Sequence, residues 1–535
     1  MIKKRYTVIL IIIAIIYSLL VLVVPFLTKY LIDEAINLSN NSNLGYDKLI
    51  LYIILISIFT LLSVLIRVID NICFSRFFVN QEAELRKRLF ESMTYKSLNS
   101  LLTFKAGDIE VLYEQDIRNI LRAKLQTIPS FVVQIVRAVA SLALLFILDE
   151  TKYKIIILIL LGIGIVALIS ARIYSKLIKP HHKKVLEADS KASNFFIEAF
   201  NHHKQIISYD AYVRSIDYYI ELNDNAKEEK RNRNRIVYSA NSFVYGFITI
   251  IYSICIILGS VFIAKGVYTY GSLIAIVQLI NNVEAPFLSL SSLINNYNLG
   301  LTSEERLKKV FDLERIDSNQ EIDDFDSIVV EDLSFSYDNE RMVIENLNLT
   351  VNKGEILKIN GESGIGKTTL LMLMLGYLKP NKGTISFIKD GKKYDTYKSR
   401  LLFSYLSQEN ILFSATLREN INILTGVTNI DKINNALKLA NIYDEIYELK
   451  DGLDTVINNN TGLSLGQIQR VLIAILILYD KPILLLDEFS SSLDKENESK
   501  IIDNLLSLNK TIIYITHRNN EIKNQQIVNI KSKEV

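Results

Sequence analysis

Long apolar runs in the first 300 residues limit what this chain can fold into more than any other feature. A helix needs about 20 apolar residues to cross about 30 Å of hydrocarbon. Runs of about this length lie at about 7–28, 48–69, 131–148, 154–173, 243–264 and 273–293. Gln134 and Arg137 interrupt the third run. Arg137 should face the translocation cavity or a carboxylate rather than lipid; the alternative is that the helix starts in the cytosol and Arg137 is still in water. The pattern predicts six transmembrane helices, the first of them an uncleaved span rather than a signal peptide.

The composition indicates a membrane part and a soluble part. The 535 residues are 50% hydrophobic with a formal net charge of +2, and the mean hydropathy is +0.23. Such a chain is too apolar for an ordinary soluble protein and too charged to lie wholly in lipid. Lys and Arg form short clusters beside apolar segments rather than one broad basic face, so nucleic acid is not an expected partner. Cys73 and Cys255 lie in or beside apolar segments and are predicted to be buried as small hydrophobes.

Basic residues fall on one side of a six-span arrangement. They gather at 3–5, 76–88, 172–184 and 230–235, whereas the other side carries few, among them Lys48, Lys152, Lys154 and Lys265. Because cytoplasmic loops are enriched in Lys and Arg, both termini are predicted to be cytoplasmic. The long segments after the second and fourth runs are rich in helix formers and are predicted to continue the membrane helices into the cytosol. The alternative is that they are solvated coiled-coil stalks.

The second half contains a phosphate-binding motif that fits G-x-x-x-x-G-K-[ST]. Its residues are Gly361, Glu362, Ser363, Gly364, Ile365, Gly366, Lys367, Thr368 and Thr369. In such a loop backbone N–H groups surround phosphates, the lysine reaches the terminal ones, and the hydroxyl after the lysine ligates Mg²⁺. A strand-like stretch at 356–359 precedes the loop and an apolar helical run at 369–378 follows it. The loop is therefore expected at the positive end of a helix.

Two carboxylates end an unbroken apolar run at 483–488. Such a run is typical of a strand buried on both faces of a parallel sheet. Carboxylates there are costly unless a cation or a proton transfer compensates, so a functional interpretation outweighs a structural one. Asp487 is expected to hold Mg²⁺ through its water shell, and Glu488 to polarise a water that attacks a phosphate.

Three further side chains are candidates for the same site. Tyr337, on a turn before the loop, could stack on an adenine, although a half-buried turn tyrosine is the simpler explanation. Gln408 leaves a short strand and could ligate Mg²⁺ or hold the attacking water. His517 follows a second buried strand, at 511–516, and so is placed at the sheet edge where the other candidates gather.

The segment 463–467 forms a second predicted anion site. Ser464 can cap the helical run at 468–479, and with the amide of Gly466 it offers donors at a positive helix end. One chain thus has two anion sites and a single phosphate loop. The second site is therefore expected to serve a nucleotide held by another copy, in a head-to-tail pair.

Together these motifs resemble those of an ATP-binding cassette (ABC) exporter half-transporter. The resemblance implies that 361–369 is the Walker A loop, Gln408 the Q-loop glutamine, 463–467 the signature and Ser492 to Asp494 the D-loop. It implies catalytic roles for Glu488, His517 and Gln408, and Mg²⁺ ligation by Thr368, Gln408 and Asp487. Tyr337 and the residues of 361–369 would bind ATP, whereas Ser464, Gly466 and Gln467 would bind the ATP of a partner.

The implied fold class is a multi-domain membrane protein. An all-α, six-helix transmembrane domain of ABC exporter type would span 1–300, a linker 301–326, and an α/β nucleotide-binding domain of P-loop type 327–535. The cofactors implied are ATP and Mg²⁺. The implied partners are a second half-transporter, the lipid bilayer and an exported peptide, lipid or drug, in the cytoplasmic membrane of a bacterium.

The resemblance implies ATP-driven export by alternating access. Two alternatives stay open. A non-pumping, ATP-gated or regulatory protein would have a similar membrane domain, although it could lose Glu488 and His517, which are intact here. One half of an asymmetric heterodimer is favoured by Leu465, which replaces a signature glycine. A second departure, three asparagines at 458–460 in place of the Glu-Arg-Gly ahead of the signature, concerns how that loop couples to the membrane domain. The retained Ser464 and Gly466 favour a homodimer.

Overall fold

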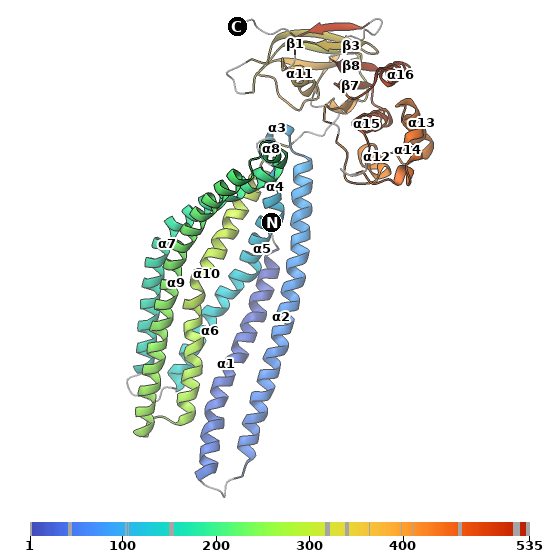
Figure 1. The fold of residues 1–535 in the computed structure, drawn as a ribbon. Coiled ribbons are helices and arrows are strands. Elements are labelled where there is room, and N and C mark those ends of the chain that lie inside the picture. The colour runs from blue at the N-terminus through green and yellow to red at the C-terminus, as the bar shows by residue number, and fades with distance from the viewer. Residues whose placement is uncertain are drawn as a thin grey trace. The chain divides into compact units, whose positions relative to one another are not determined.

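The structure is a computed structural model that divides into two compact units (Figure 1). It describes residues 3–530 apart from 41–44, 102–103, 105, 149–154, 316–321, 338–341, 363, 397–398, 410, 458–462 and 517–524. The first unit comprises Met1–Thr94 and Lys105–Asp312, and the second comprises Tyr95–Phe104 and Leu313–Val535.

The described part of the first unit is helical. Its elements are α1 (Lys4–Asn40), α2 (Asp47–Thr94), α4 (Ala106–Val111), η1 (Leu112–Asp116), α5 (Ile117–Arg122), η2 (Ala123–Thr127), α6 (Ile128–Leu148), α7 (Ile155–Asn201), α8 (His203–Ser208), α9 (Tyr212–Ala264) and α10 (Tyr270–Phe311). The π-helical turns η1 and η2 lie between α4 and α6. The predicted continuation of apolar runs into long helices is confirmed for α2, α7 and α9, each of which extends well past its run.

Four stretches of the described residues are long and apolar enough to cross a bilayer. They are Lys4–Asn40, Asp47–Thr94, Gly107–Ile147 and Tyr212–Ala264, and Tyr270–Val283 is a shorter apolar stretch. The backbone of α7 covers the expected fourth span, and α10 covers the sixth and continues through the expected helix near 303–313. The all-α membrane class is confirmed, and the total of six spans stays a prediction.

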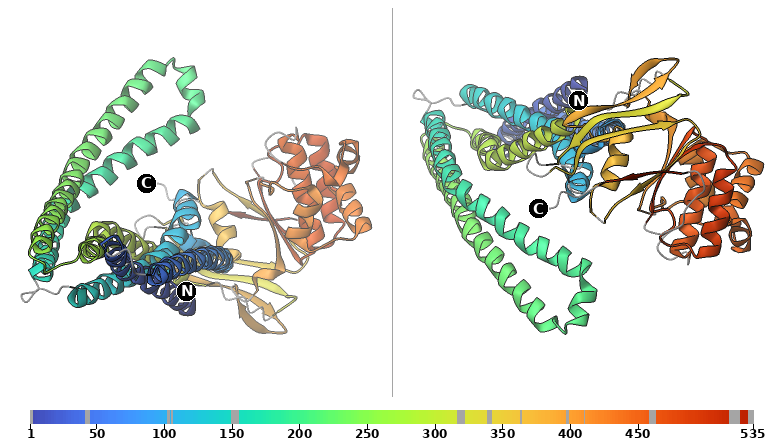
Figure 2. Two further views of the ribbon diagram at one scale, coloured as in Figure 1. Left: turned by 90° about the horizontal axis from the view of Figure 1, so that it is seen from below. Right: turned by 90° about the horizontal axis from the view of Figure 1, so that it is seen from above.

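The helices of the first unit pack in two groups. α1 packs on α2, α6 and α10, while α7 and α9 run side by side and are joined by α8. A core that includes Leu22, Leu145, Cys255, Ile276 and Leu279 links α9 to the first group. Toward α8 the α7–α9 pair diverges from the other helices of this unit (Figure 2). Cys255 is fully buried as predicted, whereas Cys73 is only half-buried because it lies on a more exposed face of α2.

Arg137 finds polar contacts inside the helix bundle. Its Nη2 donates to Ser18 Oγ at 3.3 Å, and its guanidinium lies 5.7 Å from the centre of the Tyr17 ring. It lines a cavity of about 220 Å³ that also contains Arg67 and Asp70. These contacts provide the polar surroundings expected for this charge, because a charged side chain facing hydrocarbon is unfavourable. A place in the translocation cavity stays a prediction.

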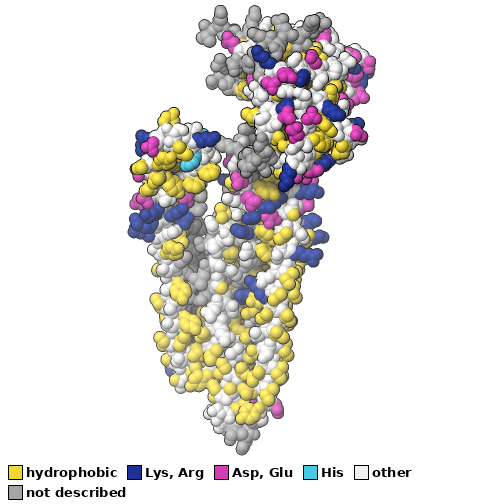
Figure 3. Space-filling view, turned by 45° about the vertical axis from the view of Figure 1, so that its right-hand side comes forward, with side chains coloured by type: hydrophobic (Ala, Val, Ile, Leu, Met, Phe, Trp, Pro, Cys, Tyr) yellow, Lys and Arg dark blue, Asp and Glu magenta, His cyan; other side chains and the backbone are white. Residues whose placement is uncertain are grey.

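The surface of the helical unit separates apolar and basic side chains. Hydrophobic side chains cover the part of the visible face that lies away from α8, and Lys and Arg form a band nearer α8 (Figure 3). This segregation is the surface counterpart of the charge pattern in the sequence.

The second unit contains two sheets. The antiparallel sheet has the order β2-β1-β4-β5, with β1 at Ser327–Phe335, β2 at Ile344–Asn352, β4 at Lys382–Lys389 and β5 at Lys392–Asp395. The parallel sheet has the order β6-β7-β8-β3-β9, with β3 at Ile356–Asn360, β6 at Phe403–Leu406, β7 at Ile483–Asp487, β8 at Thr511–Ile515 and β9 at Gln526–Asn529. Every residue of β7 and β8 is buried, as expected for inner strands of a parallel sheet.

Helices complete the second unit. They are α3 (Leu98–Leu101), α11 (Lys367–Met374), α12 (Leu417–Thr425), α13 (Ile430–Leu439), α14 (Tyr443–Glu448), α15 (Leu465–Tyr479) and α16 (Lys495–Leu506), with single 3₁₀ turns at Arg400–Leu402 and Gly452–Asp454. One hydrophobic core includes α11 and residues of both sheets, and a second includes α12, α13, α15 and α16. The segment 95–104 joins this unit because the Ser97 N–H donates to the Glu314 carbonyl at 3.1 Å.

Candidate functional site

The predicted phosphate loop connects β3 to α11. Gly366 precedes α11 with a left-handed φ of 108°, and a Cβ there would lie 2.6 Å from Val343 Cγ1, so only glycine fits. Lys367 is 7% exposed, and its ammonium donates to the carbonyls of Gly361 at 2.7 Å and Glu362 at 3.2 Å. The lysine is thus held over the loop at the N-terminus of α11, where backbone N–H groups favour an anion. Ser363 lies outside the described residues.

Asp487 ends β7 with a carboxylate that is 1% exposed. Burial raises the pKa of this carboxyl; the nearby Thr368 hydroxyl opposes the shift, Glu488 adds to it and Lys367 opposes it. Even so, neither oxygen of Asp487 has a hydrogen bond of regular geometry within the described part of the chain. A buried charge without partners is costly. A cation beside Thr368 would compensate it.

The residues present fit Mg²⁺, but they do not enclose it alone. Across the described residues no group of three His, Cys, Asp or Glu side chains could hold a metal ion. Mg²⁺ requires six oxygen ligands and commonly takes one or two carboxylates together with substrate phosphates and water. Asp487 and Thr368 would supply two such oxygens. Water and a phosphate bound in the loop beside them would supply the others.

Glu488 has a backbone conformation that is rare for its residue type. Its φ is 50°, in the left-handed region, and its N–H donates to the Ile515 carbonyl at 3.1 Å. Gln408 Nε2 donates to Glu488 Oε2 at 2.9 Å. The structure therefore brings these two predicted residues together from positions 80 apart in the chain. Such strained residues cluster at functional sites, where the surrounding structure holds them.

Gln469 supports Glu488, and the sequence analysis missed it. Its side chain is 2% exposed on α15; Nε2 donates to the Glu488 carbonyl at 3.3 Å, and Oε1 accepts from the Ser492 N–H at 3.2 Å. One amide thus spans the turn that carries the carboxylate. The available signal was a glutamine next to Arg470 within an apolar helical run, because polar residues on a buried helix face need specific partners.

Ser464 caps α15 as predicted. Its Oγ accepts from the Gln467 N–H at 3.2 Å, and Gln467 Oε1 accepts from the Ser464 N–H at 2.8 Å, which completes a capping box. Gln467 Nε2 also donates to Glu445 Oε2 at 2.7 Å, so its amide serves the helix end. A Cβ at Gly466 would lie 2.7 Å from the Ser492 carbonyl oxygen. Packing therefore requires glycine at 466, whereas the Leu465 side chain is 65% exposed.

Tyr337 lies beside the phosphate loop. Its hydroxyl is 3.2 Å from Thr369 Oγ1, and its ring packs edge-on against Phe335 with the ring centres 4.9 Å apart. The side chain is 61% exposed, so it is not the half-buried tyrosine of the simpler explanation. His517 and the asparagines at 458–460 lie outside the described residues.

Comparison with known families identifies the protein family that has this fold and this site. The family described as ABC transporter matches residues 344–491, and the family described as ABC transporter transmembrane region matches residues 7–286, more than half of the chain. The chain belongs to the ABC transporter family. It combines a helical membrane domain and an ATP-binding domain in one polypeptide, which is the fused arrangement of exporter-type ABC transporters. The ATP-binding domain of this family binds ATP and acts as an ATPase.

Individual ABC proteins resemble the chain over different lengths. A putative export ATP-binding/permease protein of Rickettsia felis is 28% identical over 522 residues, which are 94% of this chain and 88% of the relative. A probable ABC transporter ATP-binding/permease protein of Haemophilus influenzae is 35% identical over 254 residues, which are 46% of each chain. The chain thus aligns with less than half of the latter relative. The solved structure of a bacterial Atm1-family ABC exporter with ATP bound matches 99% of this chain and 93% of that chain, with a TM-score of 0.82 and 20% identity, and so shares its fold.

Proposed function

We propose that this ABC transporter is a Mg²⁺-dependent ATPase that exports a substrate across the cytoplasmic membrane of a bacterium by alternating access. One observation carries the proposal: Gln408 holds Glu488 at the end of β7, next to the buried Asp487 carboxylate, which has no regular hydrogen bond from the described residues, in a chain that also has membrane helices. A protein that only binds ATP has no need for a strained, supported carboxylate at that place. The domain bounds proposed are 1–300, 301–326 and 327–535.

Each candidate residue has a role in this proposal. The loop 361–369 binds the phosphates through its N–H groups and Lys367, and Tyr337 offers its exposed ring to the adenine. Asp487, Thr368 and Gln408 hold Mg²⁺, which when bound neutralises phosphate charge. Glu488 accepts a proton from the attacking water, and its hydrogen bond from Gln408 fixes the direction of that carboxylate. His517 is proposed as a further catalytic residue.

The working unit proposed is a dimer of two identical chains. Ser464, Gly466 and Gln467 form the N-terminal end of α15, where Ser464 is exposed and the other two are half-buried, and would contact the ATP of the partner. Leu465 does not remove any of these groups, because its side chain points to solvent. A heterodimer is the second candidate, because Leu465 replaces the family glycine. Both termini are proposed to be cytoplasmic.

Replacement of Glu488 by glutamine tests the chemistry. Glu488→Gln keeps the size and the contact with Gln408 but removes the base, so ATP should bind while steady-state turnover falls by about 10² or more. Glu496→Gln is a matched control, because Glu496 is an exposed carboxylate that pairs with Lys500 at the surface, and it should keep normal turnover. Near-normal turnover in Glu488→Gln would refute the assignment. Uptake of cargo into inverted vesicles, compared between wild type and Glu488→Gln, then tests export.

A further inference from the structure

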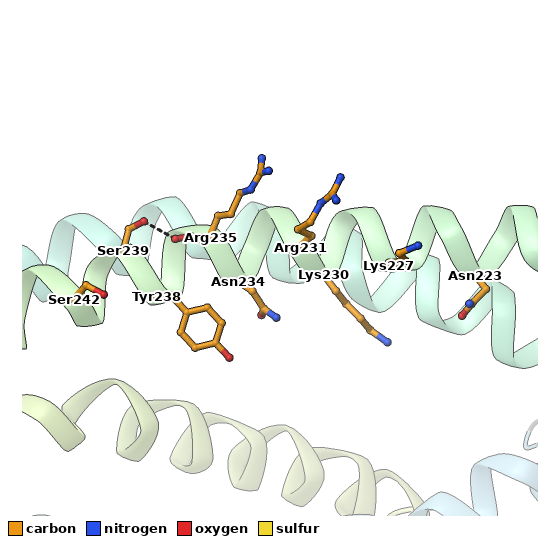
Figure 4. A pocket seen from close by; sticks show the side chains of 9 residues that line it. All are labelled: Asn223, Lys227, Lys230, Arg231, Asn234, Arg235, Tyr238, Ser239 and Ser242. Carbon is orange, nitrogen blue, oxygen red and sulfur yellow. Dashed lines mark hydrogen bonds between the residues drawn. The ribbon is translucent and has the colours of Figure 1, made fainter.

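One face of α9 carries a hollow of about 790 Å³ (Figure 4). Its lining side chains all come from α9 between Asn223 and Ser242, just before the apolar run at 243–264. They recur every three or four residues, which places them along one side of the helix. Figure 4 shows two rows, with Arg231 and Arg235 in one and Lys230, Asn234 and Tyr238 in the other.

The hollow is strongly basic. Four of its lining residues are Lys or Arg and none is acidic. Lys227 pairs with Asp224 at 3.2 Å, and Lys230 pairs with Asp189 of α7 at 2.6 Å. Arg231 and Arg235 are one turn apart, and no ion pair joins either of them to a carboxylate of the described residues. Like charges at this spacing repel each other, so the pair is not explained by helix stability.

Aromatic side chains continue this face toward the membrane run. Tyr238 lies in the hollow and is 66% exposed, and Tyr245, two turns further along the same side of the helix, is also 66% exposed. Along the helix, therefore, guanidinium groups are followed by an aromatic ring and then by membrane-level apolar surface. The guanidinium of arginine binds phosphate and carboxylate through two parallel hydrogen bonds, and aromatic rings with a polar edge favour the membrane interface.

We propose that this face of α9 binds the headgroup of an amphiphilic anion, a phosphate or carboxylate attached to an apolar body, and that such anions are the class of cargo. The inference rests on the export function proposed above. Arg231 and Arg235 hold the charged group, and Tyr238 with Tyr245 contacts the apolar part. A neutral amphiphile would leave the two arginines without a partner, and a small free anion would not use the aromatic surface.

Equilibrium binding of radiolabelled dodecyl phosphate to the full chain in phosphatidylcholine discs, without ATP, tests the site. Wild type should bind it saturably and more tightly than dodecanol or inorganic phosphate. Arg235→Gln should weaken binding by at least about tenfold, equal to about 1.4 kcal/mol. The double variant Arg231→Gln/Arg235→Gln should lose it, and Arg235→Lys should be intermediate because it keeps the charge without the planar fork. Arg233→Gln removes a charge two residues away that does not line the hollow and should stay within about twofold of wild type.

The outcomes separate this site from the proposed function. Equal loss in Arg235→Gln and Arg233→Gln, or equally tight binding of dodecanol or inorganic phosphate, overturns the site. ATP turnover in the same discs distinguishes cargo from a resident lipid: dodecyl phosphate should stimulate wild type and Arg233→Gln but not Arg235→Gln. Binding without stimulation in a chain that hydrolyses ATP overturns the cargo assignment. A chain that binds dodecyl phosphate through Arg235 but never hydrolyses ATP refutes the export function and upholds the site.

Discussion

Asp487→Asn should stabilise the nucleotide-free protein while destroying its activity. Asparagine has nearly the same shape as aspartate but carries no charge. The Asp487 carboxylate is 1% exposed and has no regular hydrogen bond from the described residues, so its charge is poorly compensated when no cation is bound. Burial of an uncompensated ion costs several kcal/mol, which the attraction of Lys367 reduces. We therefore expect the variant to gain about 1–3 kcal/mol, which corresponds to about 5–150-fold slower amide exchange in β7.

The pH dependence of this gain follows from the direction of the pKa shift. The pKa of Asp487 is raised above its ordinary value of 3.8, mainly by burial, so the folded protein holds this proton more tightly than the unfolded chain. The stabilisation from protonation is complete below the ordinary value and is lost as the pH rises through the raised pKa. The advantage of Asp487→Asn over wild type should therefore be largest above the raised pKa and shrink as the pH falls from there toward 3.8.

Hydrogen exchange measured on the full chain is the appropriate assay, because a multi-domain membrane protein does not unfold in one step. Peptides covering β7 should exchange more slowly in Asp487→Asn, and addition of ATP with Mg²⁺ should protect β7 in wild type only. Turnover in the variant should fall by about 10² or more. Asp480→Asn is the control, since Asp480 has a 79% exposed side chain and should leave β7 unchanged. Unchanged exchange at every pH, or persistent Mg²⁺-dependent turnover, would contradict the assigned role of Asp487.

Two further predictions concern α15. Gln469→Leu keeps the buried volume but removes both hydrogen bonds to the Glu488 turn, so kcat should fall by about tenfold while the KM for ATP stays within about threefold. The control is Val471→Ala, a buried truncation on the same helix, which should lower the melting temperature while kcat stays near normal. An equal loss of kcat in both variants would show that Gln469 has only a packing role. Leu465→Gly should change turnover by less than about fivefold, because this side chain faces solvent and the Ser464 cap remains. The chain purified alone should form a C₂ dimer that hydrolyses ATP, and a chain that is inactive until a different half-transporter is added would favour the heterodimer.

The sequence by itself determined those features whose physical cause is local. Apolar runs predict long membrane helices because a bilayer leaves backbone groups no other partners. The phosphate loop was predictable because its glycines, lysine and threonine act within one short segment of chain. β7 was predictable because four consecutive apolar residues that end in a carboxylate are typical of a strand buried on both faces. The cap at Ser464 belongs to this class, since its partner Gln467 is three residues away.

Tertiary structure alone decided which distant groups meet. No periodicity places the Gln408 amide on the Glu488 carboxylate, because that contact depends on β6 lying next to β7 in the parallel sheet. The sequence indicated only that the amide of Gly466 is a donor. The requirement for glycine at 466 follows from the carbonyl of Ser492, which approaches α15 only after the turn beyond β7 has folded. In the sequence Gln469 is one polar residue in an apolar helical run. Only the packing of α15 shows that its amide contacts the turn that carries Glu488. Hydrogen bonds between segments depend on relative placement, which the packing of both cores fixes and which local sequence pattern does not contain.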